Sequence, residues 1–281
     1  MVYQSKTGQL REALNTKNIV YAGVNLMKRY DAIKVVSESI LADGLAKALF
    51  LKGSIARGED DEYSDVDMYA VVAEENFDNF LNKRIEYLEK YMPLVHFSKV
   101  NFVAPQIVGI FKDALHFDLY TVKPDHIPQT GSIKIISDDS GLLDNYKKEP
   151  LCLTEDDLVE NISEFTYTII EIEAAYARND LSRCIQLFYF NYGVMALFTR
   201  YVYDKDSSLL GNKGMYKAVP PEVYSEYIKI LDHATPKSIL AAIKMLLRLF
   251  ENTITKLPKS VQNKMNREYY DVLSDRIYSM E

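Results

Sequence analysis

Hydrophobic residues in the first half of the chain fall into short runs that favour β-strands mixed with helices. Residues 48–51 (ALFL) form a continuous apolar run, and residues 66–72 place apolar side chains at alternate positions. Residues 75–91 then follow a helical period. Further strands are predicted at residues 99–103, 107–112, 115–122 and 132–136. This mixture predicts a mixed β-sheet with flanking helices.

The second half of the chain has a helical period almost throughout. Thr154 and Asp157 have the spacing of a capping box, and Asp180 is expected to cap a second helix. The predicted helices cover residues 155–172, 181–203, 237–257 and 261–278, with another that begins at Pro220-Pro221. Aromatic residues and methionines in these segments are expected to form the core of a helical bundle.

The polar segment of residues 137–150, SDDSGLLDNYKKEP, separates the two patterns. It collects Ser, Asp, Gly, Asn and Pro, which are typical of loops. We therefore expect the domain boundary near residues 138–150. The sequence predicts an α+β protein in which a mixed sheet with flanking helices is followed by an all-α helical bundle.

Charge and cysteine content exclude several classes of protein. The chain has 33 Lys and Arg against 40 Asp and Glu, a net charge of −7, and no basic stretch that would bind nucleic acid. It contains neither a run of about 18 apolar residues nor the apolar core of a signal peptide. Cys152 and Cys184 have no zinc-site or disulfide-framework spacing. We expect a cytoplasmic protein that binds neither a membrane nor nucleic acid.

One stretch, LFLKGSIARGEDDEYSDVDMYAVV, combines residues suited to phosphates and metal ions. Gly53 lacks a Cβ, so nearby backbone N–H groups can approach a phosphate, and Ser54 can donate its hydroxyl to the same oxygens. A helix that begins here would direct its positive end toward the phosphates. Asp65 and Asp67 follow at the start of a predicted strand, where alternation directs both side chains to one face.

Carboxylates in this arrangement suit Mg²⁺, which binds a few carboxylates together with substrate phosphates. Asp118, with His116 on the same face of another predicted strand, offers a third carboxylate. Two Mg²⁺ ions held in this way can activate a hydroxyl and stabilise a pyrophosphate leaving group, and Asp118 is also a candidate general base. The sequence therefore predicts Asp65, Asp67 and Asp118 as metal ligands and catalytic residues.

The structural alternative is that these acidic residues face water. Residues 59–62 (EDDE) fit that alternative, because charge runs usually form solvated surfaces. Asp65 and Asp67 fit it poorly, because they alternate with strand residues where unpaired carboxylates are costly. For Asp118, a solvated position at a strand end stays open.

The segments GSIARGEDDEYSDVDMY and HFD resemble the nucleotidyltransferase superfamily, which includes DNA polymerase β and antibiotic-modifying enzymes. From about Met27, the chain resembles lincosamide nucleotidyltransferases and, more distantly, aminoglycoside (streptomycin-type) adenylyltransferases. The form G-S-x-x-x-G-E-x-D-x-Y-S-D and the later IISDDSGLLDNY are similar to the lincosamide group. Residues 1–26 have no counterpart there, and residues 95–108 match poorly.

The resemblance implies an N-terminal extension of residues 1–26, a catalytic domain of residues 27–140 with a five-stranded mixed sheet, and a helical substrate-binding domain of residues 150–281. The implied reaction moves AMP from MgATP onto a hydroxyl of a small molecule. Antibiotics of the lincosamide or aminoglycoside type are the leading acceptors, so antibiotic resistance is the expected role. Asp65, Asp67 and Asp118 match the metal ligands of the family.

The resemblance also implies nucleotide-binding residues. Gly53 and Ser54 match the phosphate loop. The segment GNKGMYKAVPPEVY resembles one in which a lysine reaches the phosphates, which carries over to Lys213 and more loosely to Lys217, with solvated lysines as the alternative. Arg57, one turn after Ser54, either reaches a phosphate oxygen or pairs with the nearby acids.

Two alternative functions use the same residues. A nucleotidyltransferase of toxin–antitoxin type would modify a protein or RNA, although the large helical half argues against it. A non-catalytic nucleotide-binding protein would keep the fold, but it has no need for closely spaced metal ligands. The tyrosines at positions 189, 192, 201 and 203 supply either a core or a homodimer interface.

Overall fold

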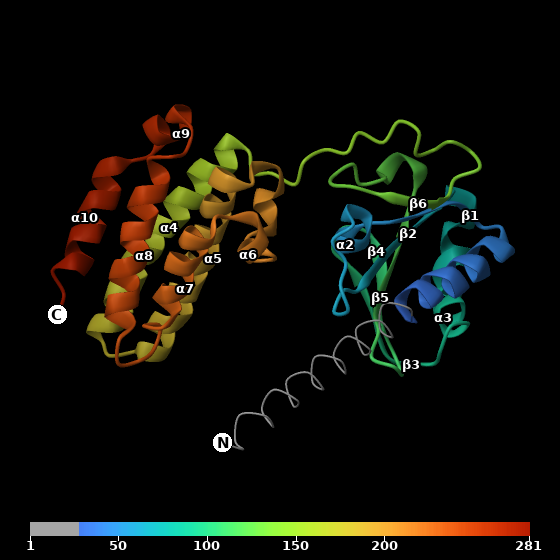
Figure 1. Ribbon diagram of the computed structural model, residues 1–281, viewed down its shortest axis with the longest axis horizontal. Coiled ribbons are helices and arrows are strands. Elements are labelled where there is room, and N and C mark those ends of the chain that lie inside the picture. The colour runs from blue at the N-terminus through green and yellow to red at the C-terminus, as the bar shows by residue number, and fades with distance from the viewer. Residues whose placement is uncertain (1–27) are drawn as a thin grey trace, which may run out of the picture. The chain divides into compact units, whose positions relative to one another are not determined.

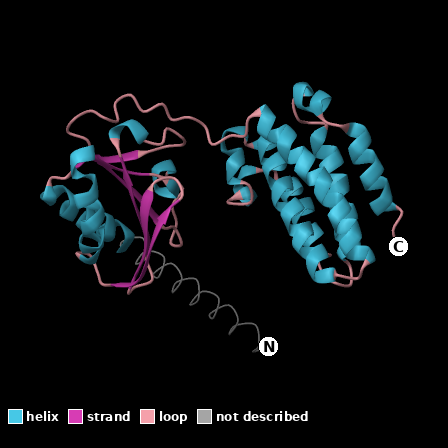
Figure 2. Ribbon diagram, turned by 180° about the vertical axis from the view of Figure 1, so that it is seen from behind, coloured by secondary structure: helices cyan, strands magenta, loops and turns pink. Residues whose placement is uncertain are grey.

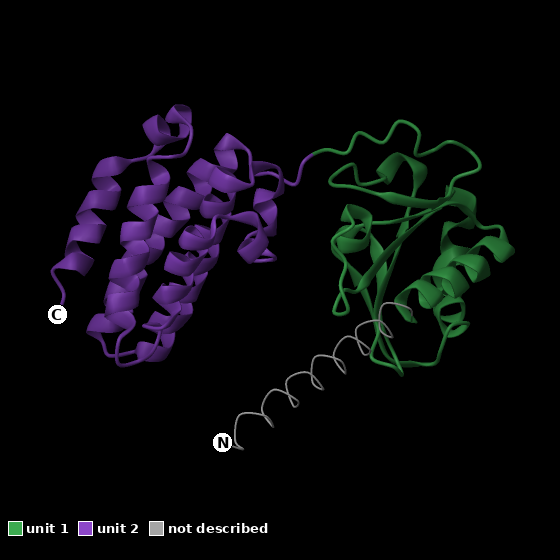
Figure 3. Ribbon diagram, viewed as in Figure 1, with its two compact units in different colours: residues 1–149 green, residues 150–281 purple. Residues whose placement is uncertain are grey.

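The computed structural model describes residues 28–281, so the predicted extension of residues 1–26 lies outside the described residues. The chain divides into two compact units, Met1–Glu149 and Pro150–Glu281 (Figure 3). The division falls at the end of the polar segment where the sequence pattern changes from mixed to helical.

The first unit is built on a six-stranded mixed sheet with strand order β3-β4-β5-β2-β1-β6. Strands β2 and β5 run parallel, and the other neighbours are antiparallel. In chain order its elements are a helix of residues 28–43, β1 (Ala46–Leu51), α2 (Gly53–Arg57), β2 (Val66–Val72), the 3₁₀ helix η1 (Glu74–Asn76), α3 (Phe77–Glu89), β3 (Leu94–Asn101), β4 (Pro105–Phe111), β5 (His116–Val122), η2 (Pro124–His126) and β6 (Lys134–Ser137).

The α+β class predicted from the sequence is confirmed, but the implied five-stranded sheet is wrong. The sixth strand is β6, which pairs antiparallel with β1 at the edge of the sheet. It follows η2 and precedes the segment that leads out of the unit (Figure 1). This short strand therefore extends the sheet on the β1 side, where β1 would otherwise be an edge strand.

Two hydrophobic clusters cover the two faces of this sheet. On one face, the helix of residues 28–43 and α3 pack against the strands through a core that includes Val36, Ile40, Phe80 and Leu88, all fully buried. Figure 2 shows these two helices on the same side of the sheet. The other face carries a smaller cluster that includes Phe50 and Leu143. Since both faces are covered at the centre of the sheet, β1 and β2 are mostly buried and largely apolar.

The predicted strand at residues 99–103 is misplaced. Strand β3 spans Leu94–Asn101, and the chain turns at residues 102–104 before β4 begins at Pro105. Phe102 and Val103 are 87% and 66% exposed at this turn. Their apolar character suggested a strand, whereas the antiparallel pairing of β3 with β4 makes them part of a hairpin connection.

The second unit is all-α, with a core formed by aromatic and aliphatic side chains from its long helices. Phe165 stacks on Phe250 with ring centroids 4.2 Å apart, and both are buried. Its elements are α4 (Glu155–Ala177), α5 (Leu181–Tyr203), η3 (Lys205–Leu210), α6 (Met215–Ala218), α7 (Pro221–Leu231), α8 (Ile239–Ile254), α9 (Lys259–Lys264) and α10 (Arg267–Tyr278). Of the four tyrosines noted in the sequence, Tyr192 and Tyr201 are core residues and Tyr189 is 48% exposed.

The predicted helix at residues 261–278 is wrong, because it is two helices. Helix α9 ends at Lys264, and Met265 has an extended backbone with φ −67° and ψ 130°. Asn266 then caps α10, since its side-chain oxygen accepts a hydrogen bond from the Tyr269 N–H at 3.1 Å. The capping residue lay within an apparently continuous helical period, which concealed the break.

The predicted capping box at the start of α4 is confirmed. Thr154 Oγ1 accepts from the Asp157 N–H at 3.1 Å, and Asp157 Oδ2 accepts from the Thr154 N–H at 2.8 Å. Asp180 caps α5 in the predicted way by accepting from the Arg183 N–H at 3.2 Å.

Replacing Thr154 by alanine is expected to lower the free energy of unfolding of the helical unit by about 1 kcal/mol, because the first turn of α4 loses a partner for its N–H groups. Urea unfolding followed by circular dichroism measures the change. Thr154→Ser is the matched control, since it keeps the hydroxyl and should retain most of the stability. Equal stability of Thr154→Ala and the unsubstituted protein would contradict this account.

Among the described residues, no helix is long and apolar enough to cross a membrane.

Candidate functional site

Gly53 and Ser54 open the short helix α2 directly after strand β1. Gly53 has φ +65°, a conformation that favours glycine. A Cβ built on Gly53 would overlap Oδ2 of Asp67 and lie 3.3 Å from its carboxyl carbon. The Lys52 N–H also donates to the Asp67 carbonyl at 2.9 Å. Glycine at this position therefore allows the Asp67 carboxylate to lie against the backbone of the Gly-Ser turn.

The predicted carboxylates lie on adjacent parallel strands. Asp67 on β2 is the register partner of Asp118 on β5, and Asp65 immediately precedes β2. The side chain of Asp118 is 10% exposed and that of Asp65 is 32% exposed. Parallel strands that start at the same edge of a sheet bring their first residues together. Pairing of β2 with β5 thus unites residues that are far apart in the sequence.

His116 joins these carboxylates. Its Nε2 donates to Oδ1 of Asp118 at 2.9 Å, and its Nδ1 lies 3.9 Å from Oδ2 of Asp65. The hydrogen bond to Asp118 raises the pKa of His116 above its usual 6.5, partial burial opposes this, and the charges of Asp118, Asp65 and Asp67 add to the rise. All three acids therefore act on one imidazole.

The raised pKa of His116 predicts a pH dependence. Because the folded state binds this proton more tightly than the unfolded state, its stabilising contribution is fully present below pH 6.5 and is lost as the pH rises through the folded-state value. NMR titration of the ring should give a pKa above 6.5 in the protein. Asp118→Asn should lower it, because the largest cause of the rise is removed. An unchanged pKa in Asp118→Asn would contradict this explanation.

Aromatic rings stack next to the candidate site on the same strands. Tyr69 and Tyr120, which follow Asp67 and Asp118 by two residues, are register partners and stack with centroids 4.2 Å apart. Tyr69 also stacks on Phe50 of β1. Since side chains two residues apart share a face, this stack lies on the same face of the sheet as Asp67 and Asp118.

Lys52, just before Gly53, is hydrogen-bonded to a segment far along the chain. Its ammonium group donates to the carbonyls of Thr130 and Pro128 at 2.6 and 3.1 Å. Burial lowers the pKa of Lys52 to about 8, and the charge of Asp67 opposes this shift. Lys52 therefore joins the Gly-Ser turn to residues 128–130, a role that the sequence pattern did not indicate.

The carboxylates of Asp65, Asp67 and Asp118 are of the ligand type that Mg²⁺ prefers. Among residues 28–281, no three His, Cys, Asp or Glu side chains converge closely enough to form a metal cage by themselves. Mg²⁺ usually binds through one or two carboxylates with water and substrate phosphates supplying the rest. The paired Asp67 and Asp118, with Asp65 beside them, fit that mode of binding.

The acidic run of residues 59–62 is not wholly solvated, which corrects the sequence-based interpretation. Asp60 accepts from Arg29 Nη1 at 2.8 Å, and its side chain is 11% exposed. Arg57 forms an ion pair with Glu59 at 2.7 Å. Pairing with a nearby acid was one of the two roles predicted for Arg57. The run therefore contains one buried and one exposed ion pair.

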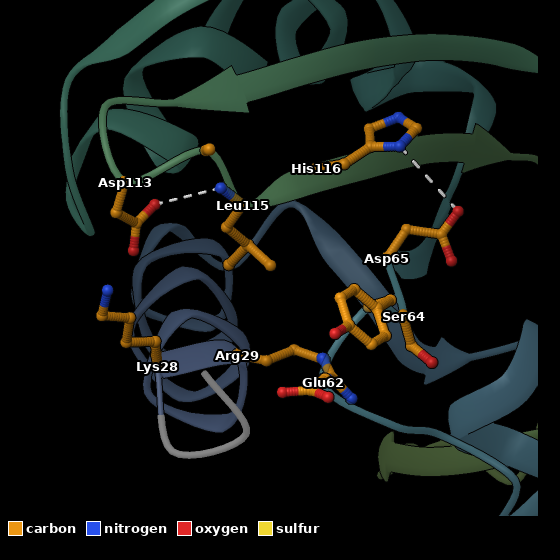
Figure 4. Close-up of a pocket in the computed structure, with 10 residues that line it drawn as sticks. Lys28, Arg29, Glu62, Ser64, Asp65, Asp113, Leu115 and His116 are labelled. Atoms are coloured by element: carbon orange, nitrogen blue, oxygen red, sulfur yellow. Dashed lines mark hydrogen bonds and ion pairs between the residues drawn. The ribbon is translucent and has the colours of Figure 1, made fainter. Parts of the chain in front are cut away.

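A pocket of about 360 Å³ adjoins the site (Figure 4). Asp65 and His116 form one wall, and the turn before β5, residues 113–115, forms another. Lys28 and Arg29 line it from the helix of residues 28–43, and Glu62, Tyr63 and Ser64 complete the lining. The pocket is bounded by both polar and apolar groups and opens beside the Asp65 carboxylate.

Lys213 and Lys217 belong to the second unit, and both side chains are exposed. Arg200, which is buried, stabilises the loop that carries Lys213, because it donates a hydrogen bond to the Lys213 carbonyl at 2.6 Å. Tyr227 donates to Oδ1 of Asn212 at 2.8 Å. The nucleotide-binding role of these lysines stays a prediction.

No protein-family model matches the chain, and no curated protein matches its sequence. Among solved structures, the crystal structure of an aminoglycoside 6-adenyltransferase from Bacillus subtilis matches with 14% sequence identity and a TM-score of 0.38. The match covers 90% of this chain and 98% of that chain. A TM-score of this size indicates only a distant similarity of the backbones, so the chemistry of this chain is inferred from its own residues. The resemblance to lincosamide enzymes stays a prediction.

Proposed function

We propose that this protein is a Mg²⁺-dependent nucleotidyltransferase that moves AMP from ATP onto a hydroxyl group of a small molecule. The observation that carries the proposal is the pairing of Asp67 with Asp118 on adjacent parallel strands, with the carboxylate of Asp67 lying against Gly53. Two carboxylates beside a glycine turn can bind a metal–phosphate complex, and one of them can also accept a proton.

In the proposed reaction, an oxygen of the acceptor attacks the α-phosphorus of ATP, and the bond from that phosphorus to the bridging oxygen of pyrophosphate breaks. Asp65, Asp67 and Asp118 would hold Mg²⁺, which when bound neutralises charge on the triphosphate and on the departing pyrophosphate. The Gly53-Ser54 turn would bind phosphate oxygens through its N–H groups and the serine hydroxyl.

Asp118 is the proposed acceptor of the proton that leaves the attacking hydroxyl. It is mostly buried and bonded to His116, so its orientation is restrained before substrate binds. The pocket beside Asp65 and His116 is the proposed approach for the acceptor hydroxyl. Antibiotics of the lincosamide and aminoglycoside types are the acceptors to examine first.

The proposal is tested by incubating the protein with MgATP and a panel of hydroxylated antibiotics, with mass spectrometry of the small molecules. The expected result is an acceptor that gains the mass of one AMP, with release of pyrophosphate that stops when Mg²⁺ is chelated. Labelled AMP found on protein or RNA of a lysate, and on no small molecule, would reject the small-molecule acceptor. Tight ATP binding without transfer to any acceptor would reject the enzymatic function.

A further inference from the structure

Arg29 is buried although it carries a permanent charge. Its side chain is 1% exposed, on the helix of residues 28–43 that packs against the sheet. A buried charge is costly unless it is paired and hydrogen-bonded. Within residues 28–281, its hydrogen-bond partners all lie in the loop of residues 58–64, which joins α2 to β2 and so connects the Gly-Ser turn to Asp65.

The guanidinium group of Arg29 binds two successive residues of that loop. Nη1 donates to Oδ2 of Asp60 at 2.8 Å, and Nη2 donates to the carbonyl of Asp61. Oδ2 of Asp60 also accepts from the hydroxyl of Tyr30 at 3.0 Å. A planar guanidinium can make both bonds at once, whereas the single ammonium of a lysine cannot reproduce that fork.

From Asp61 the hydrogen bonds continue to the site. The carbonyl of Asp61 that Arg29 binds also accepts from the Ser64 N–H at 3.1 Å, and the Asp61 N–H donates to Oγ of Ser64 at 2.9 Å. Ser64 is followed directly by Asp65. A chain of contacts therefore runs from the helix that covers the sheet to the residue that enters β2.

Electrostatics explains why the loop needs this anchor. Residues 59–62 are four consecutive acids, and Asp65 follows closely. Like charges in a short loop repel one another and favour movement into water. The Arg29–Asp60 pair, which is largely removed from solvent, opposes this movement with little screening by salt.

We propose that Arg29 is a positioning residue that, through Asp60 and Asp61, holds the loop of residues 58–64 and so fixes Asp65 relative to His116 and Asp118. The proposal rests on the proposed nucleotidyltransferase function, because Asp65 is an assigned metal ligand there. Although Arg29 borders the pocket, its side chain is 1% exposed, so the proposed effect is exerted through the loop.

Arg29→Met is the first test, because methionine fills a similar unbranched volume without the charge. We expect amide hydrogen exchange in residues 58–64 to become about tenfold faster or more, and kcat for AMP transfer to fall about tenfold, as the ordered population of the loop decreases. Arg29→Lys should recover only part of both losses. Arg84→Met is the matched control, since Arg84 is also a buried arginine of this unit, 4% exposed, but donates to the Leu81 carbonyl of its own helix. It should leave exchange in residues 58–64 unchanged.

The double variant Arg29→Met with Asp60→Leu distinguishes the effect of Arg29 on the position of the loop from its effect on the stability of the protein. Replacing a buried ion pair by apolar residues often restores stability, so its thermal midpoint should return toward that of the unsubstituted protein. The bond to the Asp61 carbonyl is still absent, so loop exchange should stay fast and kcat low. Recovery of exchange and kcat together with stability would overturn the proposal. The double variant also serves if Arg29→Met alone fails to fold.

Two other outcomes overturn the inference. Unchanged exchange of residues 58–64 in Arg29→Met would show that Arg29 does not hold the loop, whatever the enzyme does. Fast exchange with an unchanged kcat would show that the loop does not position Asp65 for the reaction. If the unsubstituted protein transfers no nucleotide, the proposed function fails, and the exchange measurement alone decides whether Arg29 holds the loop.

Discussion

Asp67→Asn is expected to lower kcat by on the order of 10³-fold, the largest loss predicted for this protein. The amide keeps the shape of the side chain but removes the negative charge that lies beside Asp118 and Gly53. Because Mg²⁺ prefers charged oxygen ligands, binding of the metal–nucleotide complex should weaken at the same time. Release of pyrophosphate and calorimetric titration with MgATP measure the two effects.

The control for this change is Asp78→Asn, which removes one negative charge from the exposed surface of α3 in the same unit. It should keep kcat close to that of the unsubstituted protein, since surface charges far from a site are screened by salt. Circular dichroism should show that both variants remain folded. Activity of Asp67→Asn within tenfold of the unsubstituted protein would refute the metal-ligand role of Asp67 and the proposed mechanism.

Gly53→Ala is expected to give the second largest effect, because it combines backbone strain with a steric overlap. A residue with a Cβ costs about 1–2 kcal/mol in the left-handed conformation that Gly53 adopts at φ +65°. The added Cβ would also displace the Asp67 carboxylate from the Gly-Ser turn. We expect lower stability together with a loss in kcat on the order of 10²-fold, since small misplacements of reacting groups are costly.

Gly44→Ala is the matched control for Gly53→Ala. Gly44 has φ +70°, follows the helix of residues 28–43, and has open space where a Cβ would extend. It should lose similar stability through the backbone conformation alone while it retains activity. The difference in kcat between the two variants isolates the overlap with Asp67. If both variants lose activity equally, the loss arises from strain and the close approach of Gly53 to Asp67 has no catalytic role.

The carboxylates around His116 favour the protonated form of its ring. His116 donates to Asp118 and lies near Asp65; the hydrogen bond to Asp118 is the largest cause of its raised pKa, and the charges of Asp118, Asp65 and Asp67 add to the rise. Clustered like charges reduce stability and are typical of functional sites, where perturbed pKa values concentrate. The acids that raise this pKa are the same ones that are proposed to hold the metal.

Local patterns in the sequence were sufficient for much of the fold. Strand β2 has the predicted bounds, and the caps at Thr154 and Asp180 form as expected. These features depend on side-chain period and on hydrogen bonds within a few residues, which a sequence states directly. The break at Asn266 was missed because the helical apolar period continues through it. The turn at Phe102 was missed because it lies in an apolar run.

Residue types and their spacing were enough to name the candidate site residues: the Gly53-Ser54 turn, the alternating Asp65 and Asp67, and Asp118 as a third carboxylate. How these residues meet, and which distant residues support them, depends on tertiary contacts. Parallel pairing of β2 with β5 places Asp118 opposite Asp67, and packing of the first described helix brings Arg29 to Asp60 across 31 positions of the chain. Because strand pairing and burial act through space, a contact between residues far apart in the chain, such as Arg29 with Asp60, has no local signature in the sequence.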